Sequence, residues 1–120
     1  MEDTKIILAG LWVATMLIFL WGDVLTMYAG DLVPGEIGGT PATQTMWVGI
    51  AALMTIPIAM VVLSLTLDQP LNRRVNIIVA AFWVIFNLTS IRDYPAYNQL
   101  LLTISMGFNL LTIWHAWKWI

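Results

Sequence analysis

Four apolar stretches, separated by shorter polar segments, dominate the pattern of hydrophobic and polar positions along the chain. Each is about 17–25 residues long, the length that an α-helix needs to cross the hydrocarbon core of a membrane. The expected spans cover residues 5–28, 45–67, 74–91 and 96–119. The sequence therefore predicts an all-α fold, with one transmembrane domain over residues 1–120 in which the four helices form an antiparallel, up-and-down bundle.

The segments between the spans contain residues that end helices. Asp68-Gln69-Pro70-Leu71-Asn72 predicts a short turn between the second and third spans, and Arg92-Asp93-Tyr94-Pro95 ends the third. The longer segment from Gly30 to Gln44 contains four glycines and two prolines, which argues against a regular helix. We predict a flexible connector there, with a lid over an outer-facing pocket as the alternative.

Composition supports an integral membrane protein whose constant partners are lipids. Hydrophobic residues make up 60% of the chain and charged residues 10%, against roughly 25% charged residues in a typical soluble domain. The net charge of −2 and the lack of a basic run give no basis for nucleic-acid binding. Without cysteine and with a single histidine, the chain has no disulfide framework and no thiolate metal site, so we expect neither a metal nor a cofactor.

Basic residues predict the direction of the helices. Lys5, Arg73, Arg74 and Lys118 fall on one side of a four-span topology, and only Arg92 falls on the other. Because cytoplasmic flanks carry the excess of Lys and Arg, we expect both termini in the cytoplasm and residues 30–44 outside. The expected location is the bacterial cytoplasmic (inner) membrane, where Arg73, Arg74 and Lys118 meet anionic lipid head groups.

Polar residues recur at helical spacing on three of the four predicted helices, so each of these helices has a polar face that should point away from lipid. The stripes are Trp12, Thr15, Phe19, Asp23 and Thr26 on the first helix, Asn76, Ala80, Trp83, Asn87 and Ser90 on the third, and Asn98, Leu102, Ser105, Asn109, Thr112 and Ala116 on the fourth. The second helix instead has a row of small residues, Ala51, Thr55 and Ala59, suited to close packing, and a proline, Pro57, that should kink it.

Asp23 is the residue on which a functional interpretation depends, because a charge inside a membrane span is costly and therefore marks a functional-site hypothesis. It follows Ile6 by 17 positions, or about 25 Å along a helix, which places it near the outer boundary of a core about 30 Å thick. Asn87 reaches a similar depth on the third span. Three interpretations stay open: an ion pair with Arg92, the anchor of a ligand, proton or cation, or a carboxylate that faces water.

No catalytic constellation emerges from the sequence. No serine or cysteine has a plausible histidine base, and neither a zinc-protease motif nor a phosphate-binding glycine loop is present. We therefore expect no catalytic residue, and a membrane enzyme acting on lipid or quinone is the weakest of the alternatives.

The leading hypothesis is a protein that binds or transports a small amphipathic or cationic molecule through an outer-facing polar and aromatic pocket. In this hypothesis Asp23 anchors the charge, and Asn87 and Asn109 orient the ligand. Apolar walls come from Trp12, Phe19 and Trp83. The competing hypothesis is an accessory or structural subunit that packs in a larger membrane protein complex. Small bundles also often dimerise, so a homo-oligomer is a further possible assembly.

Three short motifs carry a resemblance to a known class: Trp21-Gly22-Asp23 at the end of the first span, Phe86-Asn87 in the third and Phe108-Asn109 in the fourth. With them, nearly the whole chain resembles an uncharacterised family of small bacterial four-helix integral membrane proteins, a domain of unknown function. The size and helix count are also similar to those of small multidrug transporters, which place an acidic residue in their first helix. That carboxylate lies deep in the membrane, whereas Asp23 is near the outer edge, and the charge asymmetry does not fit dual insertion.

Overall fold

A computed structural model describes residues 3–30, 35–37 and 40–119 and contains the four expected helices: α1 (Asp3–Tyr28), α2 (Gln44–Thr66), α3 (Gln69–Ser90) and α4 (Ala96–Lys118). The all-α class and the number of helices are therefore confirmed. All four helices are long and apolar enough to cross a membrane, which indicates a multi-pass membrane protein.

The helix ends differ from the prediction at the start of α3. The sequence predicted a turn over residues 68–72 and a helix from Arg74, but α3 already begins at Gln69, with Pro70 in its first turn. Proline fits there because its missing N–H belongs to the group of N–H donors that have no partner within a helix. At the other end, α3 continues into one 3₁₀ turn, η1 (Ile91–Asp93), and Pro95 then keeps Tyr94 extended.

The segment between α1 and α2 contains two short strands, β1 (Glu36–Ile37) and β2 (Thr40–Pro41), which pair antiparallel. Residues 31–34 and 38–39 of this segment lie outside the described residues. The choice between a connector and a lid therefore stays a prediction.

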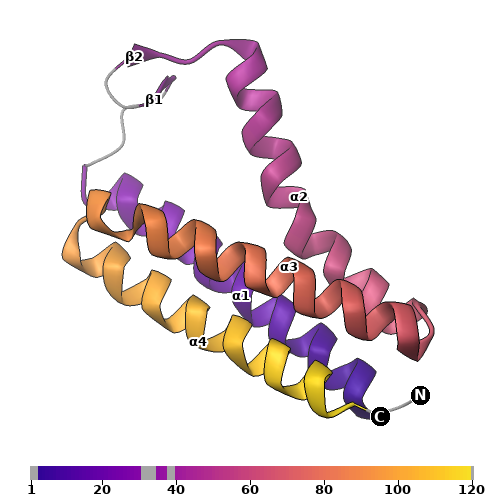
Figure 1. The fold of residues 1–120 in the computed structure, drawn as a ribbon. Helices are drawn as coiled ribbons and strands as arrows, with labels where there is room; N and C mark the ends of the chain where they lie inside the picture. Colours follow the sequence, from indigo (N-terminus) through magenta and orange to yellow (C-terminus); the bar gives the residue numbers. More distant parts are fainter. Residues whose placement is uncertain (1–2, 31–34, 38–39, 120) are drawn as a thin grey trace.

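The helices do not form a closed four-helix bundle. In Figure 1, α1, α3 and α4 run side by side, whereas α2 is packed on them only along its C-terminal half and departs from them toward its N-terminus. Every residue from Gln44 to Ala52 is exposed, and the first buried residue of α2 is Pro57. The predicted close packing of the small-residue row is wrong within this chain, because Ala51 and Thr55 are exposed. Here we name residues 44–52 the α2 arm.

The core is half polar. Among the described residues, nine hydrophobic and nine polar side chains are buried, whereas large hydrophobic side chains cover the outside of the helices. Apolar residues lie outward because the surrounding solvent of a membrane helix is hydrocarbon, and the polar residues find partners in the interior. The predicted inward faces are confirmed at Thr15, Asn76, Asn87 and Asn109, all of which are buried.

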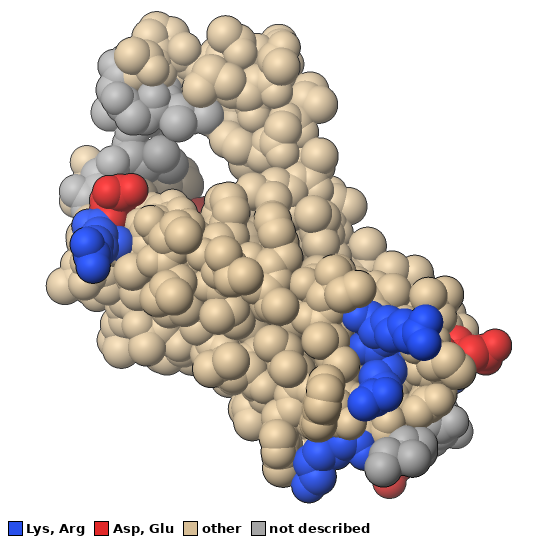
Figure 2. Space-filling view, in the orientation of Figure 1, with Lys and Arg blue, Asp and Glu red and all other residues tan. Residues whose placement is uncertain are grey.

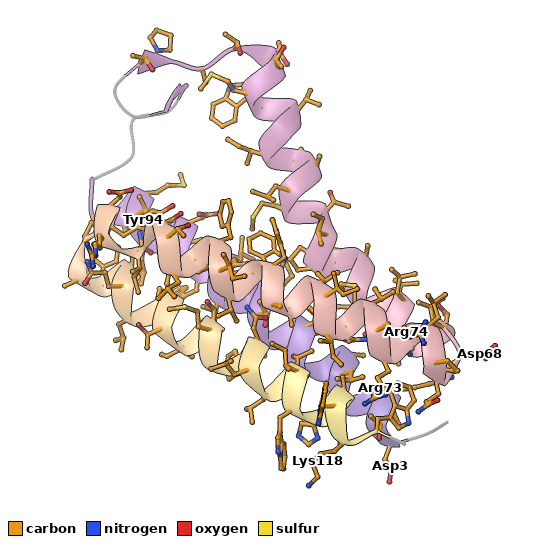
Figure 3. All side chains as sticks on the ribbon, in the orientation of Figure 1. Asp3, Asp68, Arg73, Arg74, Tyr94 and Lys118 are labelled. Atoms are coloured by element: carbon orange, nitrogen blue, oxygen red, sulfur yellow. The ribbon has the colours of Figure 1, made fainter. Side chains whose placement is uncertain are left out.

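Charged residues separate toward the two ends of the molecule. Lys5, Arg73, Arg74 and Lys118 belong to the end where α1 starts and α4 ends, here named the termini end. Figure 2 shows Lys and Arg gathered there, and Figure 3 places Arg73, Arg74 and Lys118 at that end and Tyr94 at the opposite one. The opposite end, where α1 leads toward β1, is named the loop end.

Candidate functional site

The helical register places the predicted site residues relative to one another. α1 and α3 run parallel: the Trp12 indole N–H donates to Asn76 Oδ1 at 2.7 Å across a separation of 64 residues. Phe19 and Trp83 are also 64 positions apart, and their ring centroids lie 5.1 Å apart. The same offset puts Asp23 at the level of Asn87, one helical turn closer to the loop end than the Phe19–Trp83 pair.

Aromatic rings form a continuous wall beside this level. The ring of Trp83 contacts Phe19 on one side and both Phe82 and Phe86, at 5.5 Å each, on the other. Phe82 and Phe86 are 43% and 38% exposed, whereas Trp83 is buried. Trp83 therefore lies at the boundary between the core and the exposed face of α3. Two of the three predicted wall residues, Phe19 and Trp83, are thus brought together.

The third predicted wall residue, Trp12, has a different place. It is fully buried two helical turns nearer the termini end than Phe19, and its N–H is already bound to Asn76. Trp12 belongs to the same apolar cluster as Phe19 and Trp83 but lies at the end of that cluster nearer the termini end.

Asp23 is exposed although it lies on the face of α1 that also carries buried Phe19. Its exposure follows from the α2 arm, which is unpacked along its whole length and so leaves α1 uncovered toward the loop end. Nearby, Val24, Met27 and Tyr28 line a hollow of about 390 Å³. Figure 2 shows a gap between the α2 arm and the other helices, and we name it the lateral opening.

The adjacent residue, Gly22, fixes α1 against α4 behind Asp23. A Cβ at Gly22 would lie 3.0 Å from Asn98 Oδ1, so any larger residue would require Asn98 to move. Asn98 Nδ2 in turn donates to Thr26 Oγ1 at 2.9 Å. The glycine of the Trp21-Gly22-Asp23 motif therefore has a packing role, which the sequence alone did not assign.

The predicted ion pair has no contact to support it. Within the described residues, Asp23 and Arg92 form no salt bridge or hydrogen bond with each other. The pairing stays a prediction. Among the described residues, no cationic side chain contacts the carboxylate of Asp23.

Asn109 lies away from Asp23. Contacts at both ends of the α1–α4 pair, Asn98 with Thr26 and Ala116 with Leu8, define one antiparallel register, which puts Asn109 at the level of Thr15. That level is eight residues, or about 12 Å, from Asp23 along α1. Of the two predicted ligand-orienting asparagines, the structure therefore brings only Asn87 to the level of Asp23.

The termini end is closed by a satisfied hydrogen-bond network. Asn76 Oδ1 accepts from Trp12 of α1 and from Ser64 of α2, the latter at 3.3 Å, while Asn76 Nδ2 donates to Asn72 O at 2.9 Å. Asn72 Nδ2 donates to the Ser64 carbonyl at 2.8 Å. Arg73 links α3 to α4, because its guanidinium group donates to the backbone carbonyls of Ala116 and Trp117. These bonds tie all four helices together.

Toward the middle and the loop end, by contrast, buried polar atoms have no partner. These atoms are Trp83 Nε1, Asn87 Nδ2, and both Nδ2 and Oδ1 of Asn109. Such orphan atoms are rare in native structures because each one forfeits its hydrogen bonds to water without replacement. Two of the three residues, Trp83 and Asn87, are one turn apart on α3, and Asn87 is level with Asp23.

The groups near the level of Asp23 and Asn87 are one exposed carboxylate, a wall of aromatic rings and two buried N–H donors without partners. A carboxylate and aromatic faces can attract a cation, and N–H donors can bind an acceptor. The described residues contain no group of His, Cys, Asp and Glu that could hold a metal ion. His115 lies at the far termini end of α4, where its ring contacts that of Trp114.

Comparison with known proteins gives one match. No curated protein and no solved structure matches the chain significantly. The model of one protein family, described as a family of unknown function (DUF6326), matches residues 1–119. Since the match spans nearly the whole chain, this protein belongs to that family of unknown function (DUF6326).

Proposed function

We propose that this protein binds, and in the course of transport releases, a small cationic amphipathic molecule that enters through the lateral opening. One observation carries the proposal: the exposed carboxylate of Asp23 has no cationic partner among the described residues and lies one helical turn from the aromatic wall, and the α2 arm departs from the other helices (Figure 1). An ammonium group satisfies the carboxylate, and aromatic faces attract cations through their quadrupole.

The charge distribution supports an orientation in which the lateral opening faces outward. Four of the five basic residues belong to the termini end, and only Arg92 belongs to the loop end. By the positive-inside rule the termini lie in the cytoplasm, and a bacterial cytoplasmic membrane is the proposed location. The closed network around Asn76 then seals the inner side, as expected for an outward-open arrangement of a transporter.

The proposal is tested with two hydrophobic ions of nearly the same shape and opposite charge, tetraphenylphosphonium and tetraphenylborate. Binding to the purified protein in lipid nanodiscs should be measurable for the phosphonium and absent for the borate. Asp23→Asn should weaken phosphonium binding at least tenfold, because it removes the Coulomb attraction between the carboxylate and the cation, and about 1.4 kcal/mol of lost attraction is a factor of ten in affinity.

Asp93→Asn is the matched control for this test, because Asp93 is an exposed carboxylate at the same end of the molecule but in η1, outside the lateral opening. It should leave binding unchanged. Equal binding of both ions, or equal loss of phosphonium binding in the two variants, contradicts the proposal.

A second function, an accessory subunit of a larger membrane complex, is favoured by a different observation. The α2 arm is uncharged and exposed along its whole length, with Val48 at 65% exposure. In this case Val48→Trp should release a partner protein during purification in mild detergent while tetraphenylphosphonium binding by wild type is absent. Purification of the wild-type chain alone, with phosphonium binding intact, argues against it.

A further inference from the structure

Two N–H donors on α3 have no hydrogen-bond partner, and they say more about the chemistry of the ligand than the charge of Asp23 does. Trp83 is 2% exposed and Asn87 is 4% exposed, yet Trp83 Nε1 and Asn87 Nδ2 have no acceptor. Inside a membrane protein the alternative partners are few, because hydrocarbon offers none. The indole N–H and the amide N–H are both pure donors, so the group that pairs with them must be an acceptor.

The position of the donors fixes where this acceptor lies. Asn87 is level with Asp23, and Trp83 is four residues, or about 6 Å, deeper on the same face of α3. One donor is therefore level with Asp23, and the other lies one helical turn nearer the termini end. An acceptor that binds both donors must therefore lie close to the ammonium group at Asp23, on its side toward the termini end.

The charge of Asp23 decides what kind of acceptor fits. A phosphate or carboxylate oxygen would lie at the level of the Asp23 carboxylate, and the nearest basic residue along α3, Arg92, lies beyond its end in η1 and forms no bond with Asp23. Like charges within a few Å repel. A neutral oxygen of an ester, amide or ether avoids this repulsion and still accepts both hydrogen bonds.

We propose that the ligand is an amine that carries a neutral acceptor oxygen within a few bonds of its nitrogen, followed by an apolar tail, and that Trp83 and Asn87 select for this oxygen. The tail leaves past the exposed rings of Phe82 and Phe86 into the bilayer. This inference rests on the proposed binding of a cation at Asp23.

The test compares two cations that differ in the acceptor. Lauroylcholine carries an ester oxygen two carbons from its quaternary nitrogen, and tetradecyltrimethylammonium has a similar chain without oxygen. Each displaces radiolabelled tetraphenylphosphonium from protein in phosphatidylcholine nanodiscs, and discs with the Asp23→Asn variant give the background from partitioning into lipid. Wild type should bind lauroylcholine about fivefold more tightly or better, the gain expected for one net hydrogen bond.

Two variants remove one donor each. Trp83→Phe retains an aromatic ring without the N–H, and Asn87→Leu retains the branched shape without the amide. Each should abolish most of the preference for lauroylcholine, measured as the ratio of its affinity to that of tetradecyltrimethylammonium in the same variant. Asn109→Leu is the matched control, because Asn109 is also buried and unpartnered but lies about 12 Å from Asp23, and it should leave the preference unchanged.

The outcomes separate the two proposals. If wild type binds both cations equally, or if Trp83→Phe and Asn87→Leu leave the preference intact, the selection for oxygen is refuted while cation binding stands. If Trp83→Phe weakens both cations alike, Trp83 acts only as an aromatic wall, and the selection is again refuted. If neither cation binds wild type above the Asp23→Asn background, cation binding itself fails, and the selection fails with it.

Discussion

Asn76 and Asn109 allow one substitution to be tested in two opposite environments. Both asparagines are fully buried, but Asn76 takes part in four hydrogen bonds and Asn109 in none. Asn76→Leu removes the acceptor for the Trp12 N–H and for the Ser64 hydroxyl, and it breaks the bonds to Asn72. Interhelical hydrogen bonds in membrane proteins average about 0.6 kcal/mol, with a maximum of about 1.7 kcal/mol. The loss of this set should therefore lower the free energy of unfolding by about 2–4 kcal/mol.

Asn109→Leu should have the opposite sign. Leucine has a branched shape close to that of asparagine, and the substitution removes a buried amide that has no partner, a group that costs about 1–3 kcal/mol to leave unpaired. We expect the protein to gain about 1 kcal/mol or to remain unchanged. The assay is reversible unfolding in mixed micelles of mild detergent and sodium dodecyl sulfate, followed by the fluorescence of the tryptophans.

The comparison is sharpened by a double-mutant cycle. Trp12→Phe removes only the N–H donor, so its effect should be smaller in the Asn76→Leu background than in wild type. Equal destabilisation by Asn76→Leu and Asn109→Leu, or strict additivity in the cycle, would refute the argument that the network at the termini end holds the helices together.

Two further predictions concern packing and orientation. Gly22→Ala should destabilise the protein by about 1–3 kcal/mol in the same unfolding assay, because its Cβ would lie 3.0 Å from Asn98 Oδ1. The control is Gly10→Ala, which should be neutral or stabilising because nothing lies within 4 Å of its Cβ. Equal effects of the two substitutions would contradict the close approach of α1 to α4. The native chain has no cysteine, so the single variants Tyr94→Cys and Asp68→Cys can report the topology. A membrane-impermeant maleimide added to intact cells should label Tyr94→Cys and leave Asp68→Cys unlabelled. The reverse pattern would overturn the proposed orientation.

The four helices could be predicted because their signal is local. Each apolar run is long enough to span a membrane, and polar stripes on three of them identified the inward faces that carry Thr15, Asn76, Asn87 and Asn109. The start of α3 was missed because Pro70 has two meanings, a helix stop or a first-turn residue. Both meanings are consistent with the local sequence.

The departure of α2 could not be predicted, because its sequence contains no polar stripe to indicate a buried face. The run from Gln44 to Thr66 is apolar nearly all round, and such a helix can face lipid, protein or both. For the same reason the exposure of Asp23 was ambiguous, since it depends on whether α2 covers α1. The missing partners of Trp83 and Asn87 are a tertiary property too, because the spacing of residues on one helix says nothing about acceptors on another.

Buried polar groups of the core are hydrogen-bonded at the termini end and unpaired toward the loop end, so the two ends should contribute differently to stability and to ligand binding. At the termini end, Trp12, Ser64, Asn72 and Asn76 pair with one another and link α1, α2 and α3. Toward the loop end, the donors of Trp83 and Asn87 are buried but unpaired, and the α2 arm has left the other helices (Figure 1). A protein stabilised at one end can leave polar groups unpaired at the other, because the free energy of unfolding is a property of the whole domain. Substitutions at Asn76 should therefore change stability with little effect on cation affinity, whereas substitutions at Asp23, Trp83 or Asn87 should change affinity without loss of the fold.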